Sequence, residues 1–271
     1  MARLEARMAA VDSLLCVGLD SAIERIPERF RAQPQPQLAF NRWVIDQTHP
    51  YVAAYKPNMA FYEARGEAGW TELAQTMAHL RSVDPGIFTI CDAKRGDIDS
   101  TNAGYVAGLL DGLGFDAITL HPYLGADALR PFLERADRVS IVLCRTSNPG
   151  AGELQDLLVD GEPLWELVAR RVRDEWSARA DCMLVIGATH AAELRRARDL
   201  CPDMTFLVPG VGAQGGDIAE VMRAGADRHG RGLIINASRS VIFADDPGTE
   251  ARRLRDAIRA SASAVGAGAV R

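Results

Sequence analysis

Short apolar runs alternate with amphipathic stretches along almost the whole chain. Each run is followed by a polar or glycine-containing turn, and then by apolar residues at helical spacing. Runs that are apolar on both faces are typical of parallel strands buried on each side, and strand-then-helix alternation predicts a parallel sheet with crossover helices. We predict eight strands, at Leu14–Leu19, Val52–Tyr55, Ile87–Cys91, Ala117–Leu120, Val139–Cys144, Cys182–Ile186, Thr205–Val208 and Leu233–Ile235.

The stretches between these runs predict the helices and the architecture. Eight strand–helix units without a linker-like break predict one α/β domain over residues 1–271, a closed (β/α)8 TIM barrel. An open doubly wound sheet is the competing architecture, and the count of eight ranks it second. We also expect a short N-terminal helix and a frayed tail, rich in Ala, Ser and Gly, beyond Ala260. The clearest helical spacing occurs in Leu38–Thr48, Trp70–Val83, Ser100–Gly112 and Pro163–Ala178.

Composition narrows the class of protein. The chain is 48% hydrophobic and 25% charged, the balance of an ordinary globular domain. Its 31 Lys and Arg against 36 Asp and Glu give no basic excess for nucleic-acid binding, so a site for an anion must be a local cluster. There is no signal-like start and no apolar stretch long enough for a membrane span, and the five cysteines form no C-x-x-C pair. These features favour a reduced cytoplasmic protein without membrane association.

Charged residues gather where the third predicted strand ends. In a barrel of this kind, catalytic residues lie at the carboxyl ends of the strands. Asp92 and Lys94 are two residues apart and therefore share a face, while Asp97 lies where the chain enters a helix. Together with Lys56 from the second strand, they predict an alternating array of charges, which tolerates burial because opposite charges pair. A solvated charged loop is the usual interpretation of such a pattern, but its position after an apolar barrel strand favours a functional site.

The ends of the seventh and eighth strands predict a phosphate site. The glycine-rich segment 209–216 offers bare backbone that can approach a phosphate closely, and Arg239 adds a guanidinium suited to bidentate binding. Taken singly, these features are typical of a flexible turn and of a surface arginine. Their joint position after strands seven and eight, where barrels bind phosphate, favours the phosphate interpretation.

Three further strand ends carry polar residues with two interpretations each. Asp20 could accept hydrogen bonds from sugar hydroxyls or cap a helix. Ser147 could bind a base edge or be an ordinary turn serine, and spacing alone favours the turn. His121 invites assignment as a general base, but we expect a packing or hydrogen-bonding role, because no histidine is spaced for a metal or a paired carboxylate.

At this point the sequence resembles a known family. Segment 92–98, D-A-K-R-G-D-I, is similar to the D-x-K-x-x-D-I signature of the orotidine 5'-monophosphate decarboxylase family. Lys56-Pro-Asn58, the segment 121–125 and the segment 209–214 resemble its longer bacterial branch, and the similarity runs from the first strand to the eighth. The resemblance implies decarboxylation of orotidine 5'-monophosphate to uridine 5'-monophosphate, the last step of de novo pyrimidine nucleotide synthesis, without a cofactor or a metal.

The resemblance also assigns the catalytic groups. Lys94 would stabilise a carbanion at C6 of the pyrimidine and then protonate it, and Asp92 would lie against the substrate carboxylate. Lys56 would pair with the aspartates and contact the ribose. A homodimer with a shared active site is implied, in which three residues of one subunit reach the site of its partner: Asp97, Ile98 and Thr101.

The remaining substrate contacts are implied in the same way. Asp20 would bind the ribose and Ser147 the base, while Gln214, Ser238 and Arg239 would bind the phosphate. One residue departs from the family pattern, because Ser238 stands where relatives often have glycine. Its backbone N–H stays available to a phosphate.

Three other functions compete with this assignment. An aldolase would use Lys94 or Lys56 as a Schiff-base nucleophile, but the neighbouring aspartates would hold such a lysine charged. A related sugar-phosphate decarboxylase has the same charged array and uses a bound magnesium ion. A non-catalytic nucleotide-binding protein is the third class, and the complete set of charged residues argues against it.

Overall fold

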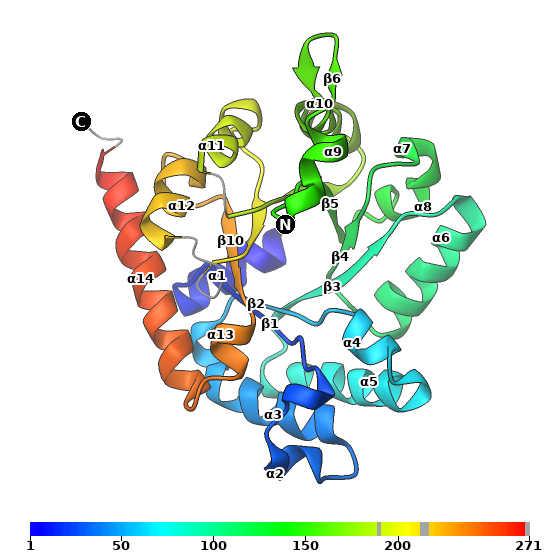
Figure 1. Ribbon diagram of the computed structural model, residues 1–271, viewed down its shortest axis with the longest axis vertical. Coiled ribbons are helices and arrows are strands. Elements are labelled where there is room, and N and C mark those ends of the chain that lie inside the picture. Colours follow the sequence, from blue (N-terminus) through cyan, green and yellow to red (C-terminus); the bar gives the residue numbers. More distant parts are fainter. Residues whose placement is uncertain (189–190, 212–216, 269–271) are drawn as a thin grey trace.

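The computed structural model describes residues 1–188, 191–211 and 217–268. Eight parallel strands close into a barrel in the order β1-β10-β9-β8-β5-β4-β3-β2, with helices around the outside (Figure 1). This confirms the predicted TIM barrel and excludes the open sheet. The strands are β1 (Leu15–Gly18), β2 (Ala54–Lys56), β3 (Phe88–Arg95), β4 (Ala117–Leu120), β5 (Val139–Arg145), β8 (Asp181–Ile186), β9 (Phe206–Pro209) and β10 (Leu233–Ala237).

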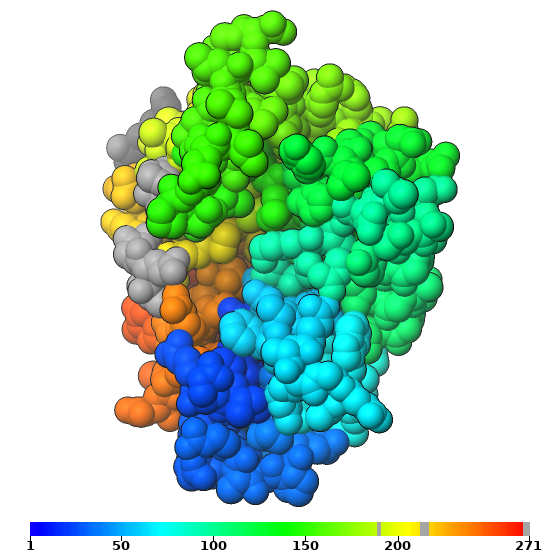
Figure 2. All heavy atoms as spheres, turned by 45° about the vertical axis from the view of Figure 1, so that its right-hand side comes forward, coloured from blue at the N-terminus to red at the C-terminus, as the bar shows by residue number. Residues whose placement is uncertain are grey.

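A small hairpin interrupts the series between the fifth and sixth barrel strands. Its strands are β6 (Leu158–Val159) and β7 (Glu162–Pro163), which pair antiparallel outside the barrel. The sixth, seventh and eighth barrel strands are therefore β8, β9 and β10. In the space-filling view the hairpin forms part of the green projection at the top of the molecule (Figure 2).

Helices occupy the predicted stretches between the strands. The predicted helix Ser100–Gly112 consists of α6 (Asp99–Tyr105) and a π-helical segment, Val106–Gly112. The predicted helix Pro163–Ala178 consists of α10 (Leu164–Arg171) and a second π-helical segment, Val172–Trp176. The α-helices are α1 (Ala2–Val11), α2 (Glu28–Arg31), α3 (Pro36–Thr48), α4 (Ala60–Glu63), α5 (Gly66–Val83), α6 (Asp99–Tyr105), α7 (Gly125–Ala128), α8 (Arg130–Leu133), α9 (Gly152–Gln155), α10 (Leu164–Arg171), α11 (Ala191–Leu200), α12 (Ile218–Gly225), α13 (Arg239–Ile242) and α14 (Pro247–Gly268). Short 3-10 helices occur at Ile23–Arg25, His49–Tyr51 and Pro149–Ala151.

The C-terminal helix corrects one prediction. We expected a frayed tail beyond Ala260, but α14 continues to Gly268. Two physical causes favour this. Alanine is the strongest helix former, and α14 packs along α3 and α12 with Leu254 and Ile258 buried.

The inside of the barrel changes from apolar to charged toward its carboxyl end. Apolar side chains of the strands, such as Phe88, Ile141 and Ile234, fill the interior, and Leu4 of α1 packs against them from the amino end. Toward the carboxyl ends of β2 and β3 the buried side chains instead include two charged ones, Lys56 and Asp92. The barrel interior is therefore a packed core, and Lys56 and Asp92 lie at its mouth.

The cysteines behave as small core residues. All five are free and buried, and burial raises the pKa of the Cys16 thiol to about 12. Across the described ranges, no helix combines the length and the apolar character that a membrane crossing requires.

Candidate active site

A charged triad of Lys56, Asp92 and Lys94 lies at the mouth of the barrel. The two carboxylate oxygens of Asp92 are each engaged by one lysine: Lys56 Nζ lies 2.7 Å from Oδ2, and Lys94 Nζ lies 2.5 Å from Oδ1. Lys56 and Asp92 are buried, whereas the Lys94 side chain is 49% exposed. The triad carries one net positive charge, and its exposed member is an ammonium that a ligand in the mouth can reach.

The ionisation of the triad follows from its pairing. Burial alone would raise the pKa of the Asp92 carboxyl, but the two ammonium groups outweigh it and hold that pKa far below its usual range. Burial likewise would lower the pKa of Lys56, and the carboxylates of Asp92 and Asp20 reverse this and raise it. Asp92 is therefore an anion and Lys56 a cation at neutral pH.

The backbone at Lys94 departs from regular strand geometry. Lys94 has a φ of 49°, in the left-handed region that costs a non-glycine residue about 1–3 kcal/mol. The pairing of β3 with β4 shifts register between Cys91 and Arg95, which marks a bulge at the same place. The conformation is held from β4, because the Lys94 N–H donates to Thr119 Oγ1 at 2.9 Å.

Thr119 is the residue of the triad's surroundings that sequence reasoning missed. Its hydroxyl accepts from the Lys94 backbone and lies 3.1 Å from Asp92 Oδ1, so it fixes both the strained backbone and the carboxylate. It is buried in β4, two residues before His121. The sequence did offer one signal. Thr119 is the one polar residue of the apolar strand β4, and a buried polar side chain needs a hydrogen-bond partner.

Asp97 does not join the charge array of its own chain. It is exposed, its Oδ1 accepts a hydrogen bond from the Ile98 N–H, and it makes no ion pair with any described residue. The expectation of one array with two carboxylates is therefore wrong within a single chain. The cause is geometric, since β3 ends at Arg95 and the chain turns outward before α6. Ile98, at 59% exposure, and Thr101 are exposed beside it.

Asp20 and Arg239 lie at the ends of β1 and β10. Asp20 does not cap the following 3-10 helix, whose N-cap is Ala22, and its Oδ1 is buried without a hydrogen-bond partner among the described residues. Arg239 is exposed at the first position of α13. Gln214, which was assigned to the phosphate, lies outside the described residues.

Ser147 lies in the loop after β5, where it packs closely against the end of β8. A Cβ added at Gly187 would come within 2.8 Å of the Ser147 Cβ, so glycine is required for this approach. A buried arginine, Arg145, holds the same loop through polar contacts that the sequence did not reveal. Arg145 donates to Glu193 Oε1 at 2.7 Å and contacts Gln155, whose side chain in turn accepts from the Thr146 N–H.

His121 packs against the loop that follows β3. A Cβ at Gly96 would lie 2.7 Å from His121 Nε2, so the imidazole ring rests on the glycine backbone. This agrees with a packing role. In the part of the chain that the structure describes, no group of three His, Cys, Asp or Glu side chains is placed to hold a metal ion.

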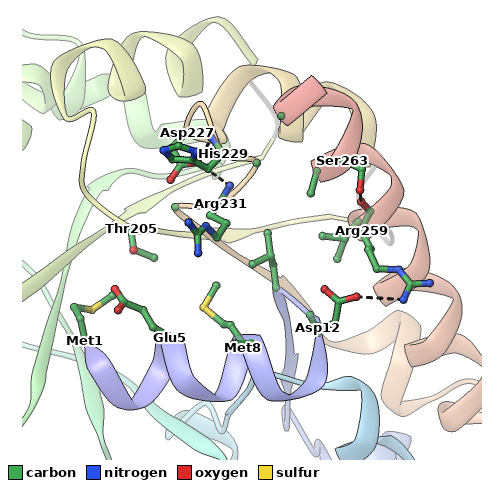
Figure 3. Close-up of a pocket in the computed structure, with 18 of the residues that line it drawn as sticks. Met1, Glu5, Met8, Asp12, Thr205, Asp227, His229, Arg231, Arg259 and Ser263 are labelled. Atoms are coloured by element: carbon green, nitrogen blue, oxygen red, sulfur yellow. Dashed lines mark hydrogen bonds and ion pairs between the residues drawn. The ribbon is translucent and has the colours of Figure 1, made fainter. Parts of the chain in front are cut away.

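A cavity of about 640 Å³ lies at the opposite, amino end of the barrel (Figure 3). It is bounded by α1, by α14 and by the segments that lead into β9 and β10, and it contains none of the predicted site residues. Charges of both signs line it, including Glu5, Asp227, Arg231 and Arg259, and Arg259 pairs with Asp12. We place the candidate active site at the mouth, where the triad of Lys56, Asp92 and Lys94 lies.

Comparisons with known proteins agree with the resemblance. A model of the "Orotidine 5'-phosphate decarboxylase / HUMPS family" matches residues 13–254. An orotidine 5'-phosphate decarboxylase of Cellvibrio japonicus is 48% identical over 237 residues, covering 87% of this chain and 86% of the relative. One of Herpetosiphon aurantiacus is 46% identical over 261 residues, covering 96% and 95%. A crystal structure of a candidate orotidine-monophosphate decarboxylase from Toxoplasma gondii superposes with a TM-score of 0.91 at 34% identity, covering 98% of both chains.

Proposed function

The chain belongs to the orotidine 5'-phosphate decarboxylase family, and from that premise we propose that Lys94 and Asp92 carry its reaction at the barrel mouth. The enzyme is a carboxy-lyase that converts orotidine 5'-monophosphate to uridine 5'-monophosphate and carbon dioxide, the last step of pyrimidine biosynthesis. The observation that supports the assignment of residues is the contact of 2.5 Å between Lys94 Nζ and Asp92 Oδ1, with Lys56 on the other oxygen of the carboxylate.

The reaction requires stabilisation of a charge on a ring carbon. When the bond from C6 to the carboxylate carbon breaks, carbon dioxide leaves and the electron pair stays on C6, where no adjacent carbonyl delocalises it. Preorganised charges in a water-poor site are then the main source of stabilisation. The Lys94 ammonium faces this charge and transfers a proton to C6, and the resulting amine regains a proton from solvent.

Magnitudes show that Lys94 does not act alone. Two unit charges 4 Å apart interact by about 4 kcal/mol at an effective dielectric of 20. Enzymes typically remove about 8–23 kcal/mol of barrier. We infer that binding of the remote phosphate supplies the remainder by orienting the base and closing the site. Repulsion between Asp92 and the substrate carboxylate ranks lower, because two ammonium groups already neutralise Asp92.

The substrate contacts are proposed from the strand ends. Asp20 binds the ribose, with Lys56, and Ser147 binds the base. Gln214, Ser238 and Arg239 bind the phosphate. The positions of Asp20 and Arg239 at the ends of the neighbouring strands β1 and β10 support this, because parallel barrel strands deliver their carboxyl ends to one site.

We also propose a homodimer in the cytoplasm whose subunits share their active sites, with Asp97, Ile98 and Thr101 completing the partner's site. Exposed apolar side chains in the loops after β3 and β4 support the dimer. Tyr123 and Leu124, in the loop after β4, are 86% and 46% exposed, and this loop is tied to the end of β3 by the hydrogen bond from His121 N to Arg95 O. Exposed apolar side chains gathered around a polar group are typical of an interface. Five free thiols support a reducing compartment.

One assay tests the function and the absence of a cofactor together. Absorbance follows conversion of orotidine 5'-monophosphate to uridine 5'-monophosphate, with and without a chelator. We expect the same turnover in both. Absence of turnover would contradict the function. Loss of turnover with chelator that magnesium restores would favour the metal-dependent sugar-phosphate class, and borohydride trapping of a substrate adduct would favour the aldolase.

A further inference from the structure

We propose that the hydroxyl of Ser238, positioned by Asn236, donates a hydrogen bond to a ribose hydroxyl of the substrate beside Asp20. The inference rests on the proposed function and adds a second role to Ser238, whose backbone N–H was assigned to the phosphate. It also brings in Asn236, to which neither the sequence nor the family pattern gave a role.

Gly18, the last residue of β1, makes room for the Ser238 side chain because it has no Cβ. A Cβ added at Gly18 would lie 1.9 Å from Ser238 Oγ and 3.4 Å from Asp20 Oδ1. The Ser238 side chain therefore occupies the space that Gly18 leaves, and the hydroxyl and the carboxylate both border that space. β1 and β10 pair in parallel at this end, so two neighbouring strands present the two groups to the same point of the mouth.

The hydroxyl of Ser238 is not used to cap a helix. Ser238 is the N-cap residue of α13, and serine in that position ordinarily accepts a hydrogen bond from a backbone N–H of the first turn. Here the side chain makes no such bond, and its Oγ instead accepts from Asn236 Nδ2 at 3.2 Å. Because Oγ is the acceptor in that bond, its own hydrogen remains available to a ligand.

Two buried acceptors beside this hydroxyl point to a ligand. Asn236 is 6% exposed and its Oδ1 has no hydrogen-bond partner within the described ranges, and the same holds for Asp20 Oδ1. Leaving a buried polar atom without a hydrogen-bond partner is unfavourable, so such atoms are rare in folded chains unless a ligand or water satisfies them.

The chemistry of the pair selects the ligand group. Asp20 can only accept a hydrogen bond, whereas Ser238 has a hydrogen to donate, so together they match a group that both donates and accepts. A hydroxyl has this property. A phosphate would place a second anion beside the Asp20 carboxylate, which disfavours it at this point. The substrate carries hydroxyls on its ribose, and we assign one of these to the pair.

Binding of nucleotides measured by calorimetry tests the assignment without turnover. The ligands are uridine 5'-monophosphate, its 2'-deoxy and 3'-deoxy forms, and uridine. We expect Ser238→Ala and Ser238→Gly to weaken the binding of uridine 5'-monophosphate about fivefold, the usual contribution of one neutral hydrogen bond. The affinity for the deoxynucleotide that lacks the contacted hydroxyl should not change. Ser263→Ala removes a hydroxyl from an exposed position on α14 and serves as the matched control.

Asn236→Ala tests the positioning role. It should weaken the binding of uridine 5'-monophosphate as much as Ser238→Ala does. The double variant should bind the nucleotide as well as either single variant, because both substitutions remove the same contact. Equal unfolding midpoints of the variants and the wild type would show that folding is intact.

Three outcomes would overturn the inference. The first is unchanged binding of uridine 5'-monophosphate in both Ser238 variants. The second is an equal loss of affinity for all three nucleotides with no loss for uridine, which would assign the hydroxyl to the phosphate. The third is a strictly additive loss of affinity in the Ser238→Ala, Asn236→Ala double variant. Failure of the proposed function would look different, because the wild type would then bind uridine 5'-monophosphate without turning over its carboxylated form.

Discussion

The two aspartates of segment 92–98 lie in opposite environments. We call Asp92 with its two lysines the buried half of the site, and Asp97 the exposed half. Asp92 is 9% exposed and paired with two lysines of its own chain, whereas Asp97 is exposed and pairs with no described residue. The Asp92 carboxylate is thus paired within its own chain, whereas the Asp97 carboxylate makes only a local hydrogen bond to the Ile98 N–H. This contrast is the basis of the proposal that Asp97 completes the site of a partner subunit.

Backbone geometry produces this contrast. The left-handed φ at Lys94 and the register shift at the end of β3 return the lysine to Asp92 while the chain moves outward. Thr119 holds that conformation from the neighbouring strand. A strained backbone that is held by a buried hydroxyl is a frequent feature of active sites.

Removing the ammonium should have the largest effect. We expect Lys94→Ala to lower turnover by at least about 10⁴-fold, because both the charge that stabilises the carbanion and the proton donor are lost. Binding of uridine 5'-monophosphate should persist in calorimetry. Lys94→Arg is the matched control, since guanidinium keeps the charge and does not release its proton, and it should also be inactive. Near-normal activity of either variant would refute the role of Lys94.

Breaking the buried half should reduce stability. Lys56→Met leaves the buried Asp92 carboxylate with one ion-pair partner, Lys94, and we expect the free energy of unfolding to fall by about 3–5 kcal/mol. Urea denaturation followed by circular dichroism measures it. A loss below about 1 kcal/mol would mean that the triad is not a tightly coupled buried cluster.

Removing the exposed half should separate activity from stability. Asp97→Ala should leave the free energy of unfolding of the chain within about 0.5 kcal/mol of wild type, because the side chain is exposed. Its kcat/KM should fall by about 10²-fold if the carboxylate completes a site. Asp97→Asn, of the same size, should be similarly impaired. Wild-type kcat/KM in both variants would leave Asp97 without a catalytic function.

The ionisation of Asp92 predicts the smallest effect, a loss of stability in acid. Its pKa is depressed in the folded state, so its stabilising contribution is complete above the ordinary carboxyl value near 4 and is lost progressively as the pH falls below that value. The thermal unfolding midpoint of the wild type should therefore fall more steeply between pH 5 and pH 3 than that of Asp92→Asn. Parallel curves would contradict the depressed pKa.

The fold was predictable from the sequence because of the composition of its strands. Buried parallel strands are apolar on both faces, so β4 has the predicted bounds and each of the other predicted strands overlaps a barrel strand. The sequence also predicted that Asp92 and Lys94 lie together, but the left-handed φ at Lys94 and the bulge, rather than the period of a regular strand, bring the two side chains into contact.

Other features depend on contacts between distant residues. Thr119, the Arg145–Glu193 pair and the Ser238–Asn236 bond each connect groups whose partnership spacing alone cannot reveal. The tail beyond Ala260 was wrongly expected to fray, because composition does not show that α14 packs on α3 and α12. The separation of Asp97 from the triad required the path of the backbone after β3.

The most direct test of the shared site mixes an inactive variant with a strongly impaired one. Lys94→Ala and Asp97→Ala subunits, exchanged in equal amounts, should form hybrid dimers in which one site carries both lesions and the other carries neither. We predict recovery of about one quarter of wild-type turnover, since half of the dimers are hybrids with one intact site of two. No recovery after verified subunit exchange would contradict the account, because each chain would then supply both halves of the motif to a single site.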